Sequence, residues 1–409
     1  MTKKSDAPAI RFKGFSDAWE QRKFGEITSK YEDPVPTPHD GYYRLGIRSH
    51  AKGTFHSYVA KGQELETAQM HRVAAGNFIV NITFGWEHAV AITDKNDAGK
   101  LVSHRFPQFS FAEGMVPEFF RYVIVDEKFR HHLWLASPGG AGRNRVLKLD
   151  EMLNYLMRFP SRDEQIKIAE FFRHLDNLIT LHQRKFEKLT NVKKSMLEKM
   201  FPQNGSSYPE IRFKGFTDPW EQRKLGDIGE TYTGLSGKTK ADFGHGQARF
   251  VTYMNVFSNP ISNPEMTEPI EIDPKQNEVE VGDVFFTTSS ETPEEVGMSS
   301  VLLEKRGKTY LNSFCFGFRP SEIIDSYYLA YMLRSESARD KIILLAQGIS
   351  RYNISKNKVM EIAVSLPSLD EQKLIGQYFR QLDNLITLHQ RELEKLQNIK
   401  KSMLEKMFV

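Results

Sequence analysis

The stretch Phe159–Phe201 reads FPSRDEQIKIAEFFRHLDNLITLHQRKFEKLTNVKKSMLEKMF, and Leu366–Phe408 repeats it at an offset of 207 residues. About 31 of the 43 positions are identical, including the unbroken segment LDNLITLHQR. Apolar residues recur at alternating steps of three and four, which is the heptad pattern of a coiled coil. They are Ile168, Phe172, Leu175, Ile179, Phe186, Leu189, Met196 and Met200 in the first copy, and Ile375, Phe379, Leu382, Ile386, Leu393, Leu396, Met403 and Met407 in the second. The repeat therefore predicts two long helices that carry the same apolar seam.

Each helix is expected to contain about 35 residues, or roughly 50 Å at 1.5 Å per residue. Both copies open with a proline, candidate capping residues and a first-turn glutamate: Pro160, Ser161, Asp163 and Glu164, then Pro367, Ser368, Asp370 and Glu371. Alone, each helix would expose its seam, so we expect an antiparallel coiled coil related by a pseudo-twofold axis. In the alternative arrangement, each helix packs only on the domain beside it. The seam is interrupted at equivalent places by His182 and His389, and by Lys193 and Lys400.

A second, shorter repeat lies upstream of each helix. Ile10–Ile27 reads IRFKGFSDAWEQRKFGEI, and Ile211–Ile228 reads IRFKGFTDPWEQRKLGDI. Between the constant segments lie residues 28–158 and 229–365, which show almost no similarity to each other. The chain is thus a tandem of constant–variable–constant units. This organisation suits a device that reads two different things through one mechanical arrangement.

The repeats divide the chain into five parts and predict an α+β fold. We expect a first domain over residues 1–158, a central helix over 159–201, a linker over 202–210, a second domain over 211–365 and a final helix over 366–409. Apolar and β-branched runs predict strands at 77–84, 88–93, 250–256, 283–288 and 311–318. Helices are predicted within the variable blocks at 117–135 and 326–346.

The composition is that of an ordinary globular protein. The 409 residues are 40% apolar and 26% charged, and the net charge of +4 permits a polyanionic partner without proving one. The first residues contain no apolar segment of a secretory signal, and no apolar run approaches the roughly 18 residues of a membrane helix. Cys315 is the only cysteine, which excludes an intramolecular disulfide and a cysteine-rich zinc site. We expect a cytoplasmic protein that does not contact a membrane.

Motifs of catalysis are missing. Gly237-Lys238-Thr239 resembles the end of a phosphate-binding P-loop, but Tyr232 stands where the first glycine is required. No Pro-Pro dipeptide occurs, so the Asn/Asp-Pro-Pro-aromatic motif of amino-methyltransferases is absent. No compact group of histidines and carboxylates indicates a metal site. These observations predict a chain that is not an enzyme and has no cofactor or metal of its own.

Motifs of binding are present at the end of each variable block. The first block ends in GGAGRNR (Gly139–Arg145) and the second in GISRYN (Gly348–Asn353). Glycine lets a backbone approach a ligand closely, and arginine suits phosphates and guanine edges. The alternative is a helix-stopping glycine followed by an arginine that pairs with a carboxylate. We predict DNA contacts from Arg143, Asn144, Arg145, Arg351, Tyr352 and Asn353, with the choice between Arg143 and Arg145 left open.

A second matched pair follows a predicted strand in each block. It reads NITFGW (Asn81–Trp86) and TTSSE (Thr287–Glu291). Small polar and aromatic side chains at a strand end suit hydrogen bonds to base edges and to the DNA backbone, although ordinary turn chemistry explains them equally well. The candidates here are Thr83, Trp86, Thr288 and Ser289, with Arg44, Arg48 and Arg249 as looser ones.

Taken together, these motifs resemble the specificity subunit of type I restriction–modification systems, and the resemblance covers essentially the whole chain. It rests on the WEQRKLGDI-type segment before each block, on the G-x-x-R-like endings, and on the Pro-Ser-x-Asp-Glu-Gln start of each helix (Pro160–Gln165 and Pro367–Gln372) followed by Leu-Asp-Asn-Leu-Ile. The first block departs from the pattern, because GAGRNRV aligns only loosely with GISRYNI.

The resemblance implies a function and a set of partners. Each variable block would be a target recognition domain that contacts one half of a split, asymmetric site in double-stranded DNA. The helices would set the spacer and carry two methyltransferase (modification) subunits, which restriction/translocase subunits join. S-adenosylmethionine, ATP and magnesium would belong to those partners. Apolar residues off the seam, namely Leu178, Leu181, Leu385 and Leu388, are expected to bind the methyltransferase subunits. The rival interpretations are an enzyme with cryptic motifs and a helical scaffold that binds only proteins.

Overall fold

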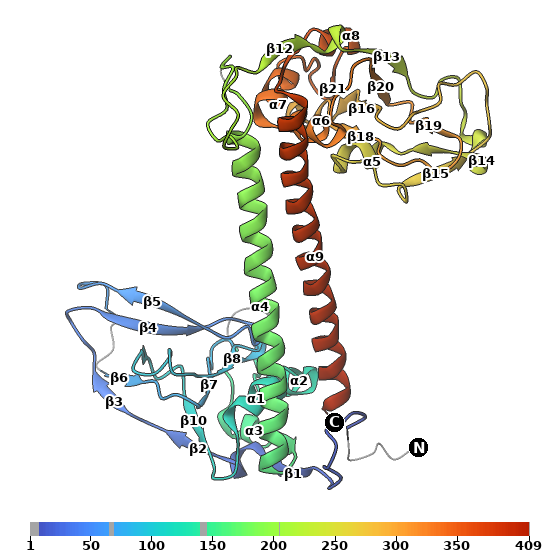
Figure 1. The fold of residues 1–409 in the computed structure, drawn as a ribbon. Helices are drawn as coiled ribbons and strands as arrows, with labels where there is room; N and C mark the ends of the chain where they lie inside the picture. Colours follow the sequence, from blue (N-terminus) through green and yellow to red (C-terminus); the bar gives the residue numbers. More distant parts are fainter. Residues whose placement is uncertain (1–7, 65–68, 140–144, 204, 409) are drawn as a thin grey trace. The chain divides into compact units, whose positions relative to one another are not determined.

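The computed structural model describes residues 8–64, 69–139, 145–203 and 205–408. The chain forms two compact units (Figure 1). Unit 1 comprises Met1–Leu181 and Leu393–Val409, and unit 2 comprises His182–Glu392. Each unit therefore contains one α+β domain together with a portion of both long helices.

The two long helices are α4 (Arg162–Lys199) and α9 (Leu369–Met407), with 38 and 39 residues. In unit 1, the seam residues Ile168, Phe172 and Leu175 of α4 share a core with Met403 and Met407 at the end of α9. In unit 2 the relation is reciprocal, with the start of α9 packed on the end of α4, through Ile375, Phe379, Leu382, Leu189, Met196 and Met200. The predicted antiparallel pairing of the two helices is confirmed.

The seam also packs on the domain of its own unit. In unit 1 the ring of Phe172 lies 4.9 Å from Tyr122 of the domain and 5.9 Å from Phe408 beyond the end of α9. In unit 2 the ring of Phe379 lies 5.1 Å from Tyr331 and 5.9 Å from Phe201. The two arrangements considered as alternatives thus occur together, because one wide apolar stripe serves both contacts.

The lysines that interrupt the seam have partners on the opposite helix. Lys400 Nζ lies 2.6 Å from Asp176 Oδ1 in unit 1, and Lys193 Nζ lies 2.5 Å from Asp383 Oδ1 in unit 2. Each carboxylate also accepts a hydrogen bond from a domain tyrosine, at 2.9 Å from Tyr122 and 2.8 Å from Tyr331. Burial, and next the neighbouring carboxylate, raise the pKa of both tyrosines, so their hydroxyls remain donors. Each unit therefore contains a Tyr–Asp–Lys group that joins its domain to both helices.

In each unit, a strand of the short repeat pairs with the strand that leads into a long helix. We call this strand pair the base of the domain. Strand β1 (Glu20–Lys23) pairs antiparallel with β11 (Leu156–Phe159), and β12 (Glu221–Lys224) pairs in the same way with β22 (Ala363–Leu366). Each variable block therefore begins after a strand of the short repeat and ends in the strand that pairs with it and leads into the long repeat.

An ion pair reinforces this base. Arg11 binds both carboxylate oxygens of Glu164, at 2.9 and 2.6 Å, and Arg212 binds those of Glu371, at 2.7 and 2.8 Å. Both glutamate side chains are only 1% exposed. The first-turn glutamates, expected to act on the helix dipole, therefore also tie each helix to the short repeat.

Besides the β1–β11 pair, the described residues of unit 1 form two larger sheets. The first has the order β2-β10-β7-β8, formed by Thr28–Tyr31, Gln108–Phe111, Phe78–Val80 and Val90–Ile92. The second has the order β3-β6-β9-β4-β5, formed by Pro34–Pro36, Gln69–Arg72, Leu101–Val102, Tyr42–Ile47 and Thr54–Val59. Strands β4 and β5 form an antiparallel arm at the edge of this sheet (Figure 1). The helices are α1 (Pro117–Val123), α2 (Glu127–Leu135) and α3 (Leu149–Leu153), with short 3-10 turns at Phe24–Glu26 and Gly85–Glu87.

The domain of unit 2 follows a related plan. Its main sheet has the order β13-β20-β16-β18, formed by Gly229–Thr233, Cys315–Pro320, Val284–Thr287 and Ser299–Val301. Beside it lie β15-β14-β19, formed by Thr267–Ile270, Phe243–Val251 and Thr309–Leu311, and the pair β17-β21, formed by Ser289–Ser290 and Tyr352–Asn353. The helices are α5 (Tyr253–Ser258), α6 (Ser326–Met332), α7 (Glu336–Ile343) and α8 (Lys356–Met360), with 3-10 turns at Leu225–Asp227, Lys240–Asp242 and Pro293–Glu295.

Local capping corrects three of the predicted elements. The predicted strand 250–256 is wrong in its second half, because the Thr252 hydroxyl accepts the Asn255 amide at 3.2 Å and starts α5. The predicted helix 117–135 is two helices, since Asp126 caps α2. The predicted helix 326–346 is likewise divided, where Ser335 caps α7. A side-chain oxygen that accepts an amide hydrogen starts a new helix even where the apolar pattern runs on.

Candidate nucleic-acid interface

Two segments that the sequence singled out separately lie together in unit 1. The Leu147 amide donates to the Ile82 carbonyl at 2.9 Å, so the end of the Gly–Arg segment adjoins the strand end. The Arg145 guanidinium lies 4.8 Å from the ring centre of Trp134 and 6.0 Å from that of Trp86. Two of the candidate residues, Arg145 and Trp86, are therefore in contact.

Unit 2 brings its two segments together through the same hydrogen bond. The Ile354 amide donates to the Thr288 carbonyl at 3.0 Å. Next to it, β17 and β21 pair antiparallel, with Ser289 opposite Asn353 and Ser290 opposite Tyr352. The four candidates Thr288, Ser289, Tyr352 and Asn353 thus lie next to one another on two hydrogen-bonded segments.

These two hydrogen bonds align the units residue by residue. Leu147 corresponds to Ile354, and counting back along the chain places Arg145 at the position of Tyr352 and Asn144 at that of Arg351. Neither Arg143 nor Arg145 therefore aligns with Arg351. Arg143 and Asn144 lie outside the described residues.

A short hairpin presents Arg351 to solvent. Gln347 and Asn353 exchange two backbone hydrogen bonds of 2.9 Å, which closes the loop between them. Gly348 has a φ of 139°, and a Cβ there would lie 2.0 Å from the Arg351 carbonyl oxygen, so the turn requires glycine. Ile349 at the tip is 96% exposed. The Arg351 side chain is exposed and, within the described part of the chain, has no ion pair or hydrogen-bond acceptor.

Several other candidates have polar groups that are used inside the protein. The Trp86 indole donates to the Thr83 carbonyl at 3.1 Å, and the Thr288 hydroxyl donates to the Phe314 carbonyl at 2.9 Å. Ser289 is buried, with 5% of its surface exposed. These residues hold the strand ends in shape, and their part in DNA contact stays a prediction.

The looser arginine candidates separate into two groups. Arg48 donates to the Thr54 carbonyl and its guanidinium lies 5.3 Å from the Phe55 ring centre. Arg249 Nε lies 2.5 Å from the Thr267 hydroxyl. Arg44 alone of the three has no acceptor among the described residues. Its availability distinguishes it from the other two.

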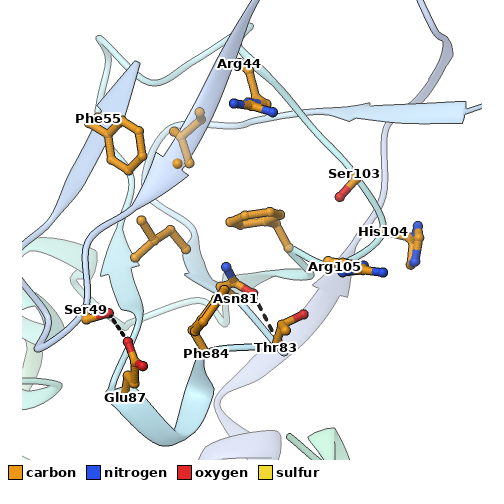
Figure 2. Close-up of a pocket in the computed structure, with 14 residues that line it drawn as sticks. Arg44, Ser49, Phe55, Asn81, Thr83, Phe84, Glu87, Ser103, His104 and Arg105 are labelled. Atoms are coloured by element: carbon orange, nitrogen blue, oxygen red, sulfur yellow. Dashed lines mark hydrogen bonds between the residues drawn. The ribbon is translucent and has the colours of Figure 1, made fainter. Parts of the chain in front are cut away.

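Arg44 lies on the wall of a hollow in unit 1 with a volume of about 760 Å³ (Figure 2). Strand β4, the 81–87 segment and the 103–106 turn surround the hollow. It is lined by Arg44, Leu45, Gly46, Ile47, Ser49, Phe55, Asn81, Thr83, Phe84, Glu87, Ser103, His104, Arg105 and Phe106. The turn closes through the Phe106 amide, which donates to the Ser103 carbonyl at 3.0 Å, and the Ile82 amide holds the Arg105 carbonyl at 3.0 Å. Backbone hydrogen bonds thus fix two of the three walls against each other.

A glycine shapes the third wall. Gly46 lies opposite Phe55 in the β4–β5 pair, and a Cβ on Gly46 would lie 2.3 Å from the Phe55 ring. The absence of a side chain at Gly46 therefore lets the Phe55 ring lie directly over the backbone of β4. No sequence pattern indicated Asn81, Phe84, His104 and Arg105 as a group, because two separate segments supply them.

The four leucines predicted to bind partners differ in exposure. Leu181, Leu385 and Leu388 are 46%, 44% and 51% exposed, whereas Leu178 is partly buried. Exposed leucines on a long helix are candidates for covering by another protein. Their role stays a prediction.

Catalytic and metal-binding groups are not gathered in the described residues. There, no three histidine, cysteine or carboxylate side chains lie so as to hold a metal ion. Cys315 is buried, and burial raises the pKa of its thiol well above the ordinary value, which disfavours the thiolate. Among these same residues, no helix has the length and apolar character needed to span a bilayer.

Each unit combines an α+β domain with portions of two long helices, and among the described residues Arg44 in unit 1 and Arg351 in unit 2 have no internal acceptor. Residues 217–398 match the family described as the type I restriction modification DNA specificity domain. The chain is 24% identical over 303 residues to the type I restriction enzyme MjaVIII specificity subunit of Methanocaldococcus jannaschii, with 69% of this chain and 68% of that protein covered. Residues 217–398 thus resemble this DNA specificity domain, and the chain as a whole is similar to curated specificity subunits of type I restriction enzymes.

Solved structures share the fold. The S subunit of the type I restriction–modification system from M. genitalium aligns with a TM-score of 0.52 at 13% identity, over 98% of this chain and 99% of that one. A chain from a structure describing complex assembly and conformational transition of the type I R-M system aligns with a TM-score of 0.50 at 16% identity, over 95% and 97%. At these identities the likeness concerns the fold alone.

Proposed function

We propose that this chain selects the DNA sequence on which a type I restriction–modification complex acts, and that each unit recognises one half of a bipartite, asymmetric site. The observation that carries the proposal is the junction repeated in both units. The same backbone hydrogen bond, Leu147 to Ile82 and Ile354 to Thr288, joins a strand end to an arginine-bearing segment. The side chains around that junction differ between the units, whereas the contacts that support it are duplicated.

The asymmetry follows from this difference. Two identical recognition units around a twofold axis would require a palindromic site. Here the constant strands, ion pairs and Tyr–Asp–Lys groups are equivalent, while residues 28–158 and 229–365 are not. Each half-site should therefore have its own sequence.

The proposed role is that of a subunit without catalytic activity. Methylation would come from two methyltransferase subunits that use S-adenosylmethionine, and cleavage from restriction subunits that use ATP and magnesium. The exposed leucines on α4 and α9 are the proposed contacts for the methyltransferase subunits. We place the assembly in the cytoplasm, where the host DNA lies.

The helices would set the length of the spacer between half-sites. One extra heptad in each of α4 and α9 keeps the seam in register and adds roughly 10 Å to each helix. At about 3.4 Å per base pair, the spacer should grow by about three base pairs with unchanged half-sites. A spacer of unaltered length at full activity would contradict this role.

The test of the main proposal is to identify the methylated sites in cells that express the full chain with its methyltransferase subunit. We expect a bipartite motif with two different halves. Exchanging residues 28–158 for the corresponding block of a related chain should change one half only. A palindromic motif, or a change in both halves, would contradict the proposal.

A further inference from the structure

We propose that the hollow in unit 1 recognises bases of the first half-site, and that Arg44 and Arg105 are its specificity-determining side chains. This inference rests on the proposed function and assigns the recognition to particular residues. The residues proposed to contact bases in unit 1 then lie on β4 and on the 103–106 turn, and not in the Gly139–Arg145 segment that the sequence indicated.

The two arginines of the hollow lie where an external acceptor could reach them. Arg44 and Arg105 reach the hollow from two different walls (Figure 2). Within the described residues, neither guanidinium has an ion pair or a hydrogen-bond acceptor. Glu87 is the one carboxylate in the lining, and it already accepts the Ser49 hydroxyl at 2.7 Å. Two cations thus border a concave surface whose one carboxylate pairs with neither of them, which favours an external acceptor.

Unit 2 differs from unit 1 at the corresponding place. Arg44 is the β4 residue that pairs in parallel with β9, and Arg249 is the β14 residue at which the corresponding parallel pairing with β19 begins. The two arginines therefore occupy corresponding strand positions. Arg249 is held by Thr267, and the cavity beside it has a volume of only about 10 Å³. The hollow of unit 1 is thus open, whereas the corresponding place in unit 2 is filled. Such a difference in shape fits two units that recognise different half-sites.

The lining of the hollow combines apolar and polar side chains. The floor is apolar, with Leu45 and Ile47 buried, and two aromatic rings, Phe55 and Phe84, remain 41% and 43% exposed at the wall. A phosphate alone gains nothing from apolar walls. A base offers both a flat apolar surface or thymine methyl and an edge with acceptors, and a guanidinium binds the O6 and N7 atoms of guanine in a bidentate manner. The lining therefore favours bases over backbone phosphates.

Asn81 and the turn add polar groups to the same surface. The Asn81 side-chain oxygen accepts the Thr83 amide at 3.0 Å, which leaves its amide nitrogen as the donor toward the hollow. Ser103 and His104 lie on the turn beside Arg105. A small number of fixed polar groups on an apolar surface is the general form of a selective site.

The experiment uses the full chain and a library of randomised duplexes, from which bound sequences are selected and counted. Arg44→Gln and Arg105→Gln should each lower discrimination at one or two positions of the first half-site by about 10- to 100-fold, with the second half-site unchanged. Arg44→Lys should lose the same discrimination but keep the salt dependence of binding, since it keeps the charge and loses the planar fork.

The matched control is Arg22→Gln on β1, which removes a positive charge from the same unit. Arg22 pairs with Glu20 at 2.6 Å, and both side chains are about half exposed. This control should leave the selected sequence unchanged. Thermal unfolding of every variant separates lost recognition from lost folding.

Two results would overturn the inference. In the first, all hollow variants select the original first half-site while Arg145→Gln relaxes it. In the second, the hollow variants weaken binding equally at all sequences and lower the salt slope by about 0.9 per contact, which identifies phosphate contacts. Failure of the proposed function itself has a different signature, because the unmodified chain would then select no bipartite sequence.

Discussion

The Nδ1 atoms of His182 and His389 lie 3.1 Å apart across the helix pair in unit 2. These two residues occupy the same position of the repeat, 207 residues apart. A residue of an antiparallel pair meets its own equivalent only at the local twofold axis of that pair. The two rings lie 5.1 Å apart between centroids, in the part of the helix pair that belongs to unit 2.

Acid should weaken the helix pair at this contact. At 3.1 Å one ring must donate and the other accept, so two imidazolium ions cannot share the contact. Desolvation, and next the charge of His182, lower the pKa of His389. In the unfolded chain the imidazole has a pKa of about 6.5, whereas in the folded protein the pKa of His389 is lower. Below about pH 6.5 the unfolded state therefore binds more protons than the folded state, and the free energy of unfolding falls as the pH drops. Urea unfolding of the full chain between about pH 5 and 7.5 measures this loss.

The matched variant replaces both histidines by leucine. It should remove part of the acid sensitivity and raise stability, because the seam becomes continuous. Burial also lowers the pKa of His88 in unit 1, so only the difference between the two proteins reports on the pair. An unchanged pH dependence would contradict the assignment.

The Tyr–Asp–Lys groups should make equal contributions in the two units. Tyr122→Phe and Tyr331→Phe each delete one hydrogen bond to a carboxylate, which typically contributes about 1.5–3 kcal/mol. Tyr155→Phe is the control, since burial raises the pKa of Tyr155 to about 12 but its hydroxyl has no partner in the described residues. Denaturant unfolding should show a loss for the first two variants and little change for the third.

The buried ion pairs at the base should be essential for each unit. Glu164→Gln leaves Arg11 mostly buried without its charge partner, and Glu371→Gln does the same to Arg212. Breaking such a pair from one side costs about 3 kcal/mol or more. Glu20→Gln, which breaks the exposed pair with Arg22, should change stability by less than about 1 kcal/mol. Equal effects of the buried and the exposed variants would refute this ranking.

Arg351 should contact DNA from the hairpin of unit 2. If it binds a phosphate, Arg351→Ala will weaken binding at all sequences and lower the salt slope by about 0.9. If it binds guanine, the variant will cost about 1–3 kcal/mol and relax one position of the second half-site. Gly348→Ala should have a similar effect by distorting the hairpin. Binding assays at several salt concentrations distinguish the two outcomes, and unaltered affinity and specificity of Arg351→Ala would reject the contact.

The exposed leucines should matter for assembly and not for folding. Replacing Leu178, Leu181, Leu385 and Leu388 by serine should reduce binding of the methyltransferase subunit while both units stay folded. Co-purification measures the first effect and thermal unfolding the second. Normal assembly of the fourfold variant would show that the partners dock elsewhere.

The helices could be predicted from the sequence because their signals are local. A step of three or four residues places apolar side chains on one face of a helix whatever surrounds it. The repeat then supplied the pairing, since two copies of one seam can bury each other. The cap at Thr252 shows the limit of this reasoning, because an apolar run over 250–256 gave no sign that its second half would become a helix.

The sequence did not predict which side chains pair with the repeated lysines and aspartates of the two helices. Lys193 and Lys400 looked like defects of the seam, and the aspartates that pair with them, Asp383 and Asp176, lie on the opposite helix. Tyr122 and Tyr331 lie inside the variable blocks, so comparison of the two repeats passed over them. A contact between segments far apart in sequence leaves no periodic pattern to detect.

What the sequence determined by itself is the duplicated frame: two long helices, two short constant segments and the division into two units. Only the tertiary structure decided which arginines remain available to DNA. Arg44 and Arg249 are the same residue type at corresponding strand positions, yet one faces an open hollow and the other is held by Thr267. The physical reason is that a guanidinium is free or occupied according to the acceptors that folding brings beside it, and the chain places those acceptors through distant segments.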